Sequence, residues 1–196
     1  MNLSIIYYST YGSNYQLALW AQEAAVALGA NVRLRQVQEL APQSVIDNQP
    51  GWKAQQDKSK DVPVAASDDI EWADALLFSV PSRFGNVPAQ FKQFIDTQGG
   101  LWSKGKTINK AVSAMSSAQN PHGGQEATIL NLYTSMHHWG AIIVSPGYTD
   151  ASIGKAGGNP YGTSVSIDAS GNMVEDVKDA VVHQVTRLLS IAEKLK

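Results

Sequence analysis

The sequence predicts one doubly wound α/β domain, in which five parallel strands carry helices on both faces of the sheet. Two observations lead to this prediction. Apolar segments of strand length alternate with helical segments, which is the pattern of repeated βαβ units. The strand segments are almost continuously apolar, as strands buried on both faces are. A chain of 196 residues is long enough for one such domain with a proper core, and we expect it to span residues 1–196.

The predicted elements follow in a regular order. Strands are expected at residues 3–8, 31–37, 75–80, 110–115 and 141–145. Helices are expected at 15–28, 70–73, between Pro88 and the Gly99-Gly100 pair, at 125–138 and at 175–196. Residues 38–67 are polar and interrupted by proline, so we expect a long excursion with one short helix. Residues 153–162 are rich in glycine and read as a loop.

Three loops are expected to meet at one edge of this sheet. They follow the first, third and fourth strands, at residues 9–14, 81–88 and 116–124. In doubly wound sheets, ligands bind outside the carboxyl ends of the strands, where the winding direction switches. These loops therefore form the candidate site.

The first of these loops has the composition of an anion site. Hydroxyl, amide and glycine residues run from Ser9 to Asn14 and lead directly into a helix. Free amides at a helix start favour a phosphate, and the lack of Lys or Arg in this stretch suits a single phosphomonoester of a mononucleotide. The same residue types also cap ordinary helices, so both interpretations stand on these residues alone.

Composition excludes several classes of function. The net charge is -2, which provides no basic field for nucleic acid or anionic lipid. There is no cysteine, so disulfides, thiolate catalysis and sulfur-ligated metals are excluded. His122 and His183 have no partners at ligand spacing, and no metal is predicted. We see neither a signal peptide nor a membrane span, and expect a soluble, cytoplasmic protein.

One nucleotide motif occurs in the wrong setting. Residues 100–107, GLWSKGKT, match the pattern of a triphosphate-binding loop. That loop needs a strand before it and a helix after it, so that the helix amides face the phosphates. Here a predicted helix precedes the motif and a predicted strand follows it. We therefore reject an ATPase or GTPase function, and the absence of GxGxxG after the first strand argues against a dinucleotide-type Rossmann turn.

Several short motifs occur in a fixed order along nearly the whole chain. They are Tyr7–Gly12, Pro81–Asn86, Gly99–Trp102, Ser116–Ser117, Gly123–Glu126, His137–His138 and Gly158–Gly162. Together they resemble the WrbA family of flavodoxin-like NAD(P)H:quinone oxidoreductases. The resemblance implies a flavodoxin-like sheet of order 2-1-3-4-5, FMN as cofactor, NAD(P)H as electron donor, a quinone as acceptor and a homotetramer.

The resemblance also implies a role for individual residues. The FMN phosphate would be held by Ser9, Thr10, Tyr11, Gly12, Ser13 and Asn14. The isoalloxazine would be lined by Ser82, Arg83, Phe84, Gly85, Asn86, Ser117, Ala118, Gln119, Asn120 and Gly123. Tyr11 would lie near the nicotinamide cofactor and Trp102 beside the quinone. His137, at the flavin edge, would stabilise charge on the reduced ring or on the quinone oxygen, which makes it the catalytic candidate.

Five residues of these motifs also have ordinary structural interpretations. Trp102 follows a Gly-Gly pair and suits a capping contact, and Phe84 suits the core. His137 and His138 at a helix end complement the helix dipole. Arg83 is the kind of residue that forms a surface ion pair.

The function that follows from the resemblance is electron transfer from NAD(P)H to quinones by a ping-pong mechanism, because both substrates would use one face of the ring. The alternative is a flavodoxin-type electron carrier that binds FMN but has no nicotinamide site. A third hypothesis is an interaction module that has lost its flavin. The modest net charge argues against the carrier, which relies on a strongly acidic face for docking.

Overall fold

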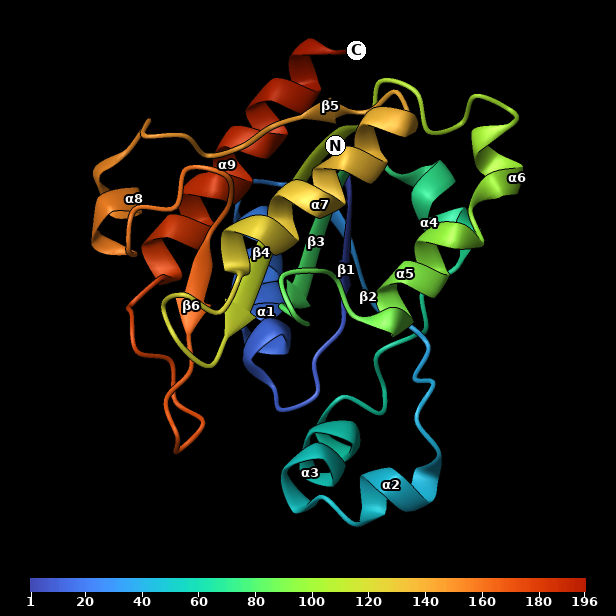
Figure 1. Ribbon diagram of the computed structural model, residues 1–196. Coiled ribbons are helices and arrows are strands. Elements are labelled where there is room, and N and C mark those ends of the chain that lie inside the picture. The colour runs from blue at the N-terminus through green and yellow to red at the C-terminus, as the bar shows by residue number, and fades with distance from the viewer.

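The computed structural model describes residues 1–196 and confirms the predicted sheet (Figure 1). The strands run in the order β2-β1-β3-β4-β5, with β6 also paired to β4, and every neighbouring pair is parallel. Their bounds are β1 Asn2–Tyr7, β2 Asn31–Gln36, β3 Ala75–Pro81, β4 Ala111–Ala118, β5 Ile142–Ile143 and β6 Ser164–Ser166.

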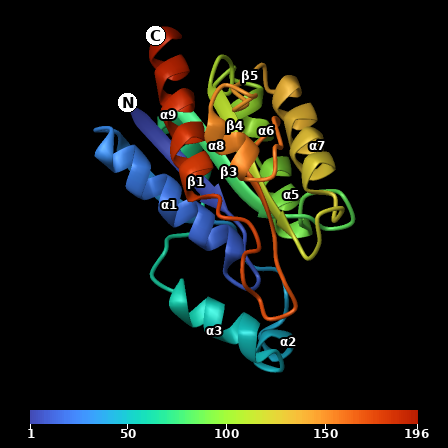
Figure 2. The same cartoon turned by 90° about the vertical axis from the view of Figure 1, so that its left-hand side faces the viewer.

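Helices cover both faces of the sheet, as Figure 2 shows. Alternate residues of the buried strands point to opposite faces, so that Ile5 of β1 packs toward α1 and α9 while Ile6 packs toward α5 and α7. The helices are α1 Ser13–Ala27, α2 Gln43–Asp47, α3 Pro50–Lys58, α4 Ser67–Trp72, α5 Ala89–Asp96, α6 Gly99–Trp102, α7 Gln125–His138, α8 Ala151–Lys155 and α9 Lys178–Lys194. No helix has the length and apolar character needed to cross a membrane.

Two short strands share the last position of the sheet. β5 pairs with the first residues of β4, and β6 pairs with the last ones, from Ser116 to Ala118. The prediction of one strand at 141–145 was therefore wrong in length, and β6 was not predicted. The segment that enters β6 lies tight against β4, since a Cβ on Gly162 would lie 2.0 Å from the carbonyl oxygen of Ala114.

Three other expectations need correction. The excursion at 38–67 contains two helices, α2 and α3, and α4 starts at its last residue. β4 continues through Ala118, so residues 116–118 are strand rather than loop. α6 begins at the Gly-Gly pair that was expected to end a helix, and α8 occupies the start of the predicted loop at 153–162. The rejection of the triphosphate loop is confirmed, because β4 follows that motif.

Candidate functional site

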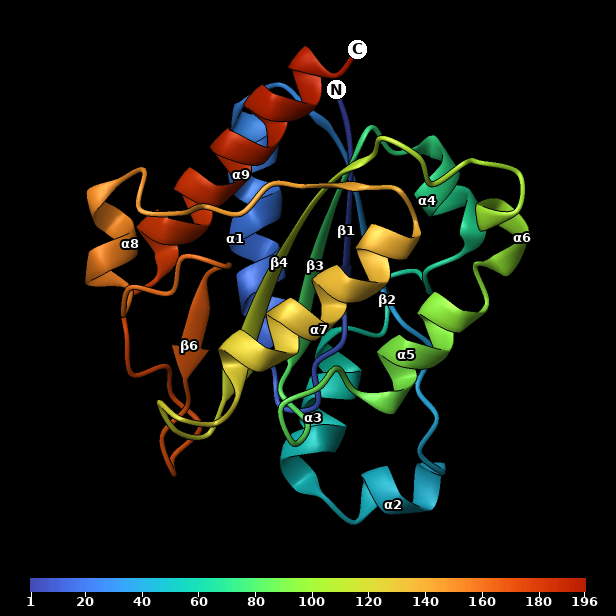
Figure 3. The same cartoon turned by 45° about the horizontal axis from the view of Figure 1, so that its top comes forward.

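The candidate site lies at the carboxyl edge of the sheet, where the loops after β1, β3 and β4 come together. α2 and α3 lie beneath this edge at the bottom of Figures 1 and 3. Side-chain hydrogen bonds join the three loops directly: Ser82 Oγ donates to the Gly123 carbonyl at 2.8 Å, and the Arg83 guanidinium donates to Thr10 Oγ1 at 2.7 Å. The expectation that the loops meet is confirmed by these contacts.

The loop after β1 presents unused amide donors at the start of α1. Gly12 has φ +104° and precedes the helix, and its own N–H donates to Ser9 Oγ at 3.0 Å. The amides of Ser13, Asn14 and Tyr15 donate to no protein atom. Free amides at the positive end of a helix dipole favour a bound anion, and the nearby hydroxyls add further donors.

The Asn14 side chain points inward, away from these amides. It is 1% exposed, and its Nδ2 donates to Ser117 Oγ at 2.7 Å. Ser79 Oγ donates to the Asn14 carbonyl at 3.0 Å and to Oδ1 at 3.2 Å. The Asn14 side chain thus ties the first loop to β3 and β4, which leaves its backbone amide as the group that faces the site.

Gln55 of α3 lies directly against Gly12, a contact that was not predicted from the sequence. Its side chain is buried, its Nε2 has no hydrogen-bond partner, and its Oε1 would lie 2.9 Å from a Cβ on Gly12. The only signal in the sequence was the expected helix within residues 38–67, whose position was unknown. Residues 38–67 therefore pack, through Gln55, against the loop at residues 9–14, which is called the amide loop below.

The Arg83 guanidinium lies beside the loop at residues 9–14, which contains no Lys or Arg of its own. Its backbone forms a tight turn with Asn86, in which Arg83 N–H donates to the Asn86 carbonyl at 2.8 Å and the reverse bond is 3.0 Å. The guanidinium reaches Thr10, which is itself buried. Arg83 forms no ion pair with a carboxylate, so the surface ion-pair interpretation is wrong.

Phe84 sits at the tip of the same turn with its ring completely exposed. Its φ is +55°, in the left-handed region that a residue with a bulky side chain rarely adopts. The core interpretation of Phe84 is therefore wrong. Strained backbone of this kind is concentrated at ligand sites, so the exposed aromatic ring points to a binding surface.

The loop after β4 packs against the same turn. Ser82 Oγ donates to the Gly123 carbonyl at 2.8 Å, and Gly85 N–H donates to Ser82 Oγ at 3.2 Å. Gly124, with φ +88°, allows this approach, because a Cβ there would lie 2.8 Å from Gly85 Cα. Ala118 is half-buried, while Gln119 and Asn120 are exposed beyond the end of β4.

Tyr11 is held against α3 rather than against the other loops. Its hydroxyl donates to Gln49 Oε1 at 2.7 Å, and a Cβ on Gly51 would lie 3.3 Å from the Tyr11 ring. The side chain is 59% exposed, so most of the ring is open to a ligand.

Tyr8, at the end of β1, is buried, and burial raises the pKa of its hydroxyl. The hydroxyl therefore stays neutral, and it donates to Glu39 Oε2 at 3.0 Å.

Trp102 and His137 lie at the other end of the molecule. α7 starts at the carboxyl edge with Gln125 and runs for 14 residues to His138. At 1.5 Å per residue, its last turn lies roughly 20 Å from its first residue. Trp102 Nε1 donates to the His138 carbonyl at 2.9 Å, so Trp102 belongs to that far end and caps α7 there. Its indole is still 56% exposed. Within one chain, the structure does not bring Trp102 or His137 to the three loops.

No group of three or more His, Cys, Asp or Glu side chains is arranged to hold a metal ion. Taken together, the carboxyl edge offers free amides, hydroxyls, one guanidinium and exposed aromatic rings. This set of groups is chemically suited to a phosphate and a flat ring system, and it contains no evident nucleophile or general base.

Comparisons with known proteins agree with this geometry. Residues 1–154 match the family model described as NADPH-dependent FMN reductase. A Deinococcus radiodurans protein named NAD(P)H dehydrogenase (quinone) is 50% identical over 100% of this chain and 97% of its own. A Geotalea daltonii protein of the same name is 37% identical over 100% of this chain and 98% of its own.

Solved structures show the same fold. The crystal structure of a WrbA-like flavodoxin protein from Agrobacterium tumefaciens superposes with a TM-score of 0.65 at 20% identity, covering 100% of this chain and 99% of that one. The family resemblance and the flavodoxin-like architecture expected from the sequence are both confirmed. The chain belongs to the NADPH-dependent FMN reductase family.

Proposed function

We propose that this chain is an FMN-dependent NAD(P)H dehydrogenase that reduces quinones, and that residues 1–196 act as one domain. The observation that carries the proposal is the set of unpartnered amides of Ser13, Asn14 and Tyr15 at the carboxyl edge of a flavodoxin-like sheet. The two relatives described above carry the name NAD(P)H dehydrogenase (quinone), and the family model names FMN.

The residues present fit FMN. The amides and the Ser9, Thr10 and Ser13 hydroxyls suit its phosphate, with the Arg83 guanidinium adding positive charge beside Thr10. The turn at Ser82–Asn86 and the loop from Ser117 to Gly123 would line its ring, as the resemblance implies. When bound, FMN supplies the redox chemistry, accepting a hydride equivalent and giving up electrons to an acceptor.

The chain's own part is binding, orientation and exclusion of water. Phe84 and Tyr11 provide flat apolar surface beside the ring position, where a nicotinamide or a quinone would stack. Hydride transfer to a flavin requires no general base, which agrees with the absence of an evident one in the three loops. If both substrates use the same exposed face they bind in turn, so we propose a ping-pong mechanism in which NAD(P)+ leaves before the quinone enters.

We also propose that the active form is a homotetramer in which Trp102 and His137 complete the site of a neighbouring copy. The support is their location: both lie at the amino edge of the sheet, with the Trp102 indole exposed and far from the carboxyl-edge loops of the same chain. Trp102 would then cover the quinone, and His137 would stabilise negative charge that develops on the quinone oxygen. Sedimentation that shows only monomer at micromolar concentration would contradict this assembly.

The experiment that tests the function is a visible spectrum of the purified protein after incubation with FMN and desalting, followed by addition of NADH or NADPH without air. A retained yellow band that bleaches and returns on addition of benzoquinone is the expected result. Retention without bleaching by either donor would identify an electron carrier, and no retained flavin would identify an interaction module that has lost its cofactor.

A further inference from the structure

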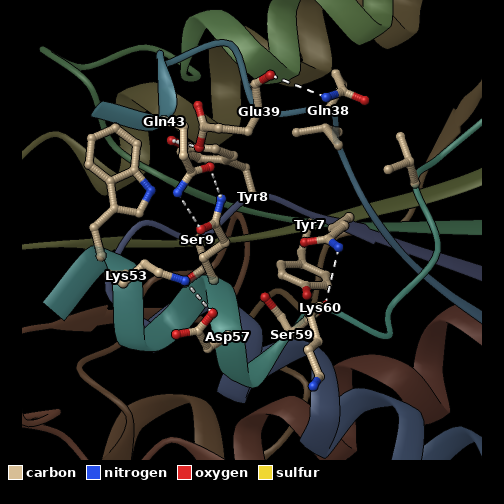
Figure 4. Close-up of a pocket in the computed structure, with 15 residues that line it drawn as sticks. Tyr7, Tyr8, Ser9, Gln38, Glu39, Gln43, Lys53, Asp57, Ser59 and Lys60 are labelled. Atoms are coloured by element: carbon tan, nitrogen blue, oxygen red, sulfur yellow. Dashed lines mark hydrogen bonds and ion pairs between the residues drawn. The ribbon is translucent and has the colours of Figure 1, made fainter. Parts of the chain in front are cut away.

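A second cavity opens beside the amide loop, on the β2 side of the carboxyl edge (Figure 4). It has a volume of about 480 Å³ and lies between the ends of β1 and β2 and helix α3. This size is within the range of small-molecule sites. Ser9 belongs both to this cavity and to the loop that leads into α1, so the cavity adjoins the FMN site proposed above without being part of it.

One buried hydroxyl in this cavity has no partner. Tyr7 is 1% exposed, and its hydroxyl makes no hydrogen bond in the structure. Figure 4 places Tyr7 beside Ser59, whose hydroxyl donates to the Gln55 carbonyl at 2.9 Å and does not reach hydrogen-bond geometry with the Tyr7 hydroxyl. Burial raises the pKa of Tyr7, so the group is a neutral donor. A buried hydroxyl that lacks a partner costs stability, and a polar ligand in the cavity would supply the missing acceptor.

The remaining lining combines a flat ring with polar and cationic groups. Trp52 of α3 offers an indole face. The amides of Gln43 and Gln56 are hydrogen-bonded to each other, and Gln38 Nε2 donates to the Glu39 carbonyl at 3.3 Å. Lys60 makes neither an ion pair nor a hydrogen bond, whereas Lys53 is already paired with Asp57. Glu39 is satisfied too, since it accepts hydrogen bonds from Tyr8, Gln90 and two backbone amides. The groups left for a ligand are therefore an aromatic ring, a hydroxyl and an ammonium.

We propose that this cavity binds the adenosine-phosphate half of the NAD(P)H donor, an inference that rests on the function proposed above. A purine stacks on an indole, its ribose and ring nitrogens suit neutral donors such as the Tyr7 hydroxyl, and its phosphates suit Lys60. Its position also fits, because Ser9, which accepts a hydrogen bond from the Gly12 amide, is one of the residues that line the cavity.

The first test is titration of the FMN-loaded protein with ADP by calorimetry, which requires no hydride transfer. Trp52→Ala is expected to weaken ADP binding about tenfold through loss of stacking. Lys60→Ala should weaken ADP more than adenosine, while Lys155→Ala, which removes an exposed cation in the last turn of α8 away from both sites, should bind ADP as the parent protein does. Absence of ADP binding, or equal affinity in the Trp52→Ala variant, would overturn the proposal.

Tyr7→Phe gives a second and independent readout. The ring is retained and only the unpartnered hydroxyl is removed, so we expect lower ADP affinity together with an unchanged or higher melting temperature. A variant that loses stability and binds ADP normally would show that the hydroxyl serves the fold instead.

Kinetics then separate this inference from the function on which it rests. With Trp52→Ala, the KM for NADH should rise about tenfold, while the KM values for reduced nicotinamide mononucleotide, which lacks the adenosine half, and for benzoquinone should not change. Equal increases for both donors would overturn the assignment but leave the enzyme's function standing. An FMN-loaded protein that binds ADP through Trp52 yet is never reduced by NAD(P)H would instead refute the function and the identity of the donor.

Discussion

The carboxyl and amino edges of the sheet differ in what holds their exposed side chains. At the carboxyl edge, Arg83, Ser82 and Asn14 are fixed by hydrogen bonds between three loops, and free amides remain at the start of α1. At the amino edge, Trp102 has one hydrogen bond to the end of α7 and leaves more than half of its surface open. The first edge has the fixed geometry that suits the proposed ligand site, whereas the second exposes an aromatic side chain, which suits the proposed contact with a neighbouring copy.

This difference is consistent with separate proposed tasks for the motif residues that resemble the WrbA family. Those in the three loops lie at the carboxyl edge of the sheet, whereas Trp102 and His137 lie at the amino edge. Residues that bind the cofactor need a rigid geometry, which the loops at the switch point of the sheet provide. Residues that cover a substrate have no such requirement, and a symmetric oligomer can deliver them from a neighbouring chain. The predictions below test whether the two edges have these separate tasks.

The largest expected effect is on the amide loop. Gly12→Val places a β-branched side chain at φ +104° and against Gln55, which distorts the loop. FMN affinity should fall on the order of a hundredfold, measured by quenching of flavin fluorescence. Gly154→Ala, at a position with open space, serves as control and should bind FMN normally. Normal FMN binding by Gly12→Val would remove the amide loop from the site.

The next effect concerns stability. Asn14→Ala removes the donor to the buried Ser117 hydroxyl and one of the two acceptors of Ser79 Oγ, which keeps only the Asn14 carbonyl, and this should lower the free energy of unfolding by about 2 kcal/mol. Urea denaturation measures this change. Asn48→Ala removes an exposed hydrogen bond to the Ser44 carbonyl and should cost less than about 0.5 kcal/mol. Equal losses in the two variants would mean that the buried network does not tie the loop to the sheet.

Arg83→Ala should have a smaller effect, confined to the ligand. Loss of the guanidinium beside Thr10 is expected to weaken FMN binding about tenfold, and riboflavin binding less, because riboflavin has no phosphate to attract the charge. Parallel titrations with the two flavins give the ratio. Lys92→Ala, an exposed cation on α5, is the matched control. An identical loss for FMN and riboflavin would place Arg83 beside the ring alone.

The smallest effect on FMN binding is expected at the amino edge. Trp102→Ala should change FMN affinity by less than about twofold, because its side chain lies at the far end of α7. Its kcat/KM for quinone should nevertheless fall, since the quinone loses its aromatic cover. A variant with normal quinone turnover would exclude Trp102 from the site in any subunit.

Sequence reasoning succeeded where local pattern and tertiary structure agree. The continuous apolar runs of β1 and β3 and the periodic helices α1, α7 and α9 are specified by their own residues, and the strand order followed from the family resemblance. The prediction missed β6 because Ser164–Ser166 has no strand pattern of its own. This segment owes its conformation to pairing with the end of β4.

At the site, sequence reasoning found the loops but not their contacts. The composition of Ser9–Asn14 indicated an anion site, yet nothing in the chain showed that Arg83 would reach Thr10 or that Gln55 would lie under Gly12. Such contacts depend on how separate loops are placed by the fold. The placement of Trp102 and His137 was likewise invisible, because a motif records order along the chain and not the edge of the sheet on which it lies.

The measurement that tests the division of tasks most directly is complementation between two impaired variants. Gly12→Val lacks a working cofactor loop but keeps Trp102, and Trp102→Ala has the opposite defect. If each site draws these parts from two chains, coexpression in equal amounts should restore about a quarter of the sites and a corresponding share of NADH:benzoquinone activity. Activity no greater than the sum of the two separate variants would contradict the account, because it would mean that both parts act within one chain.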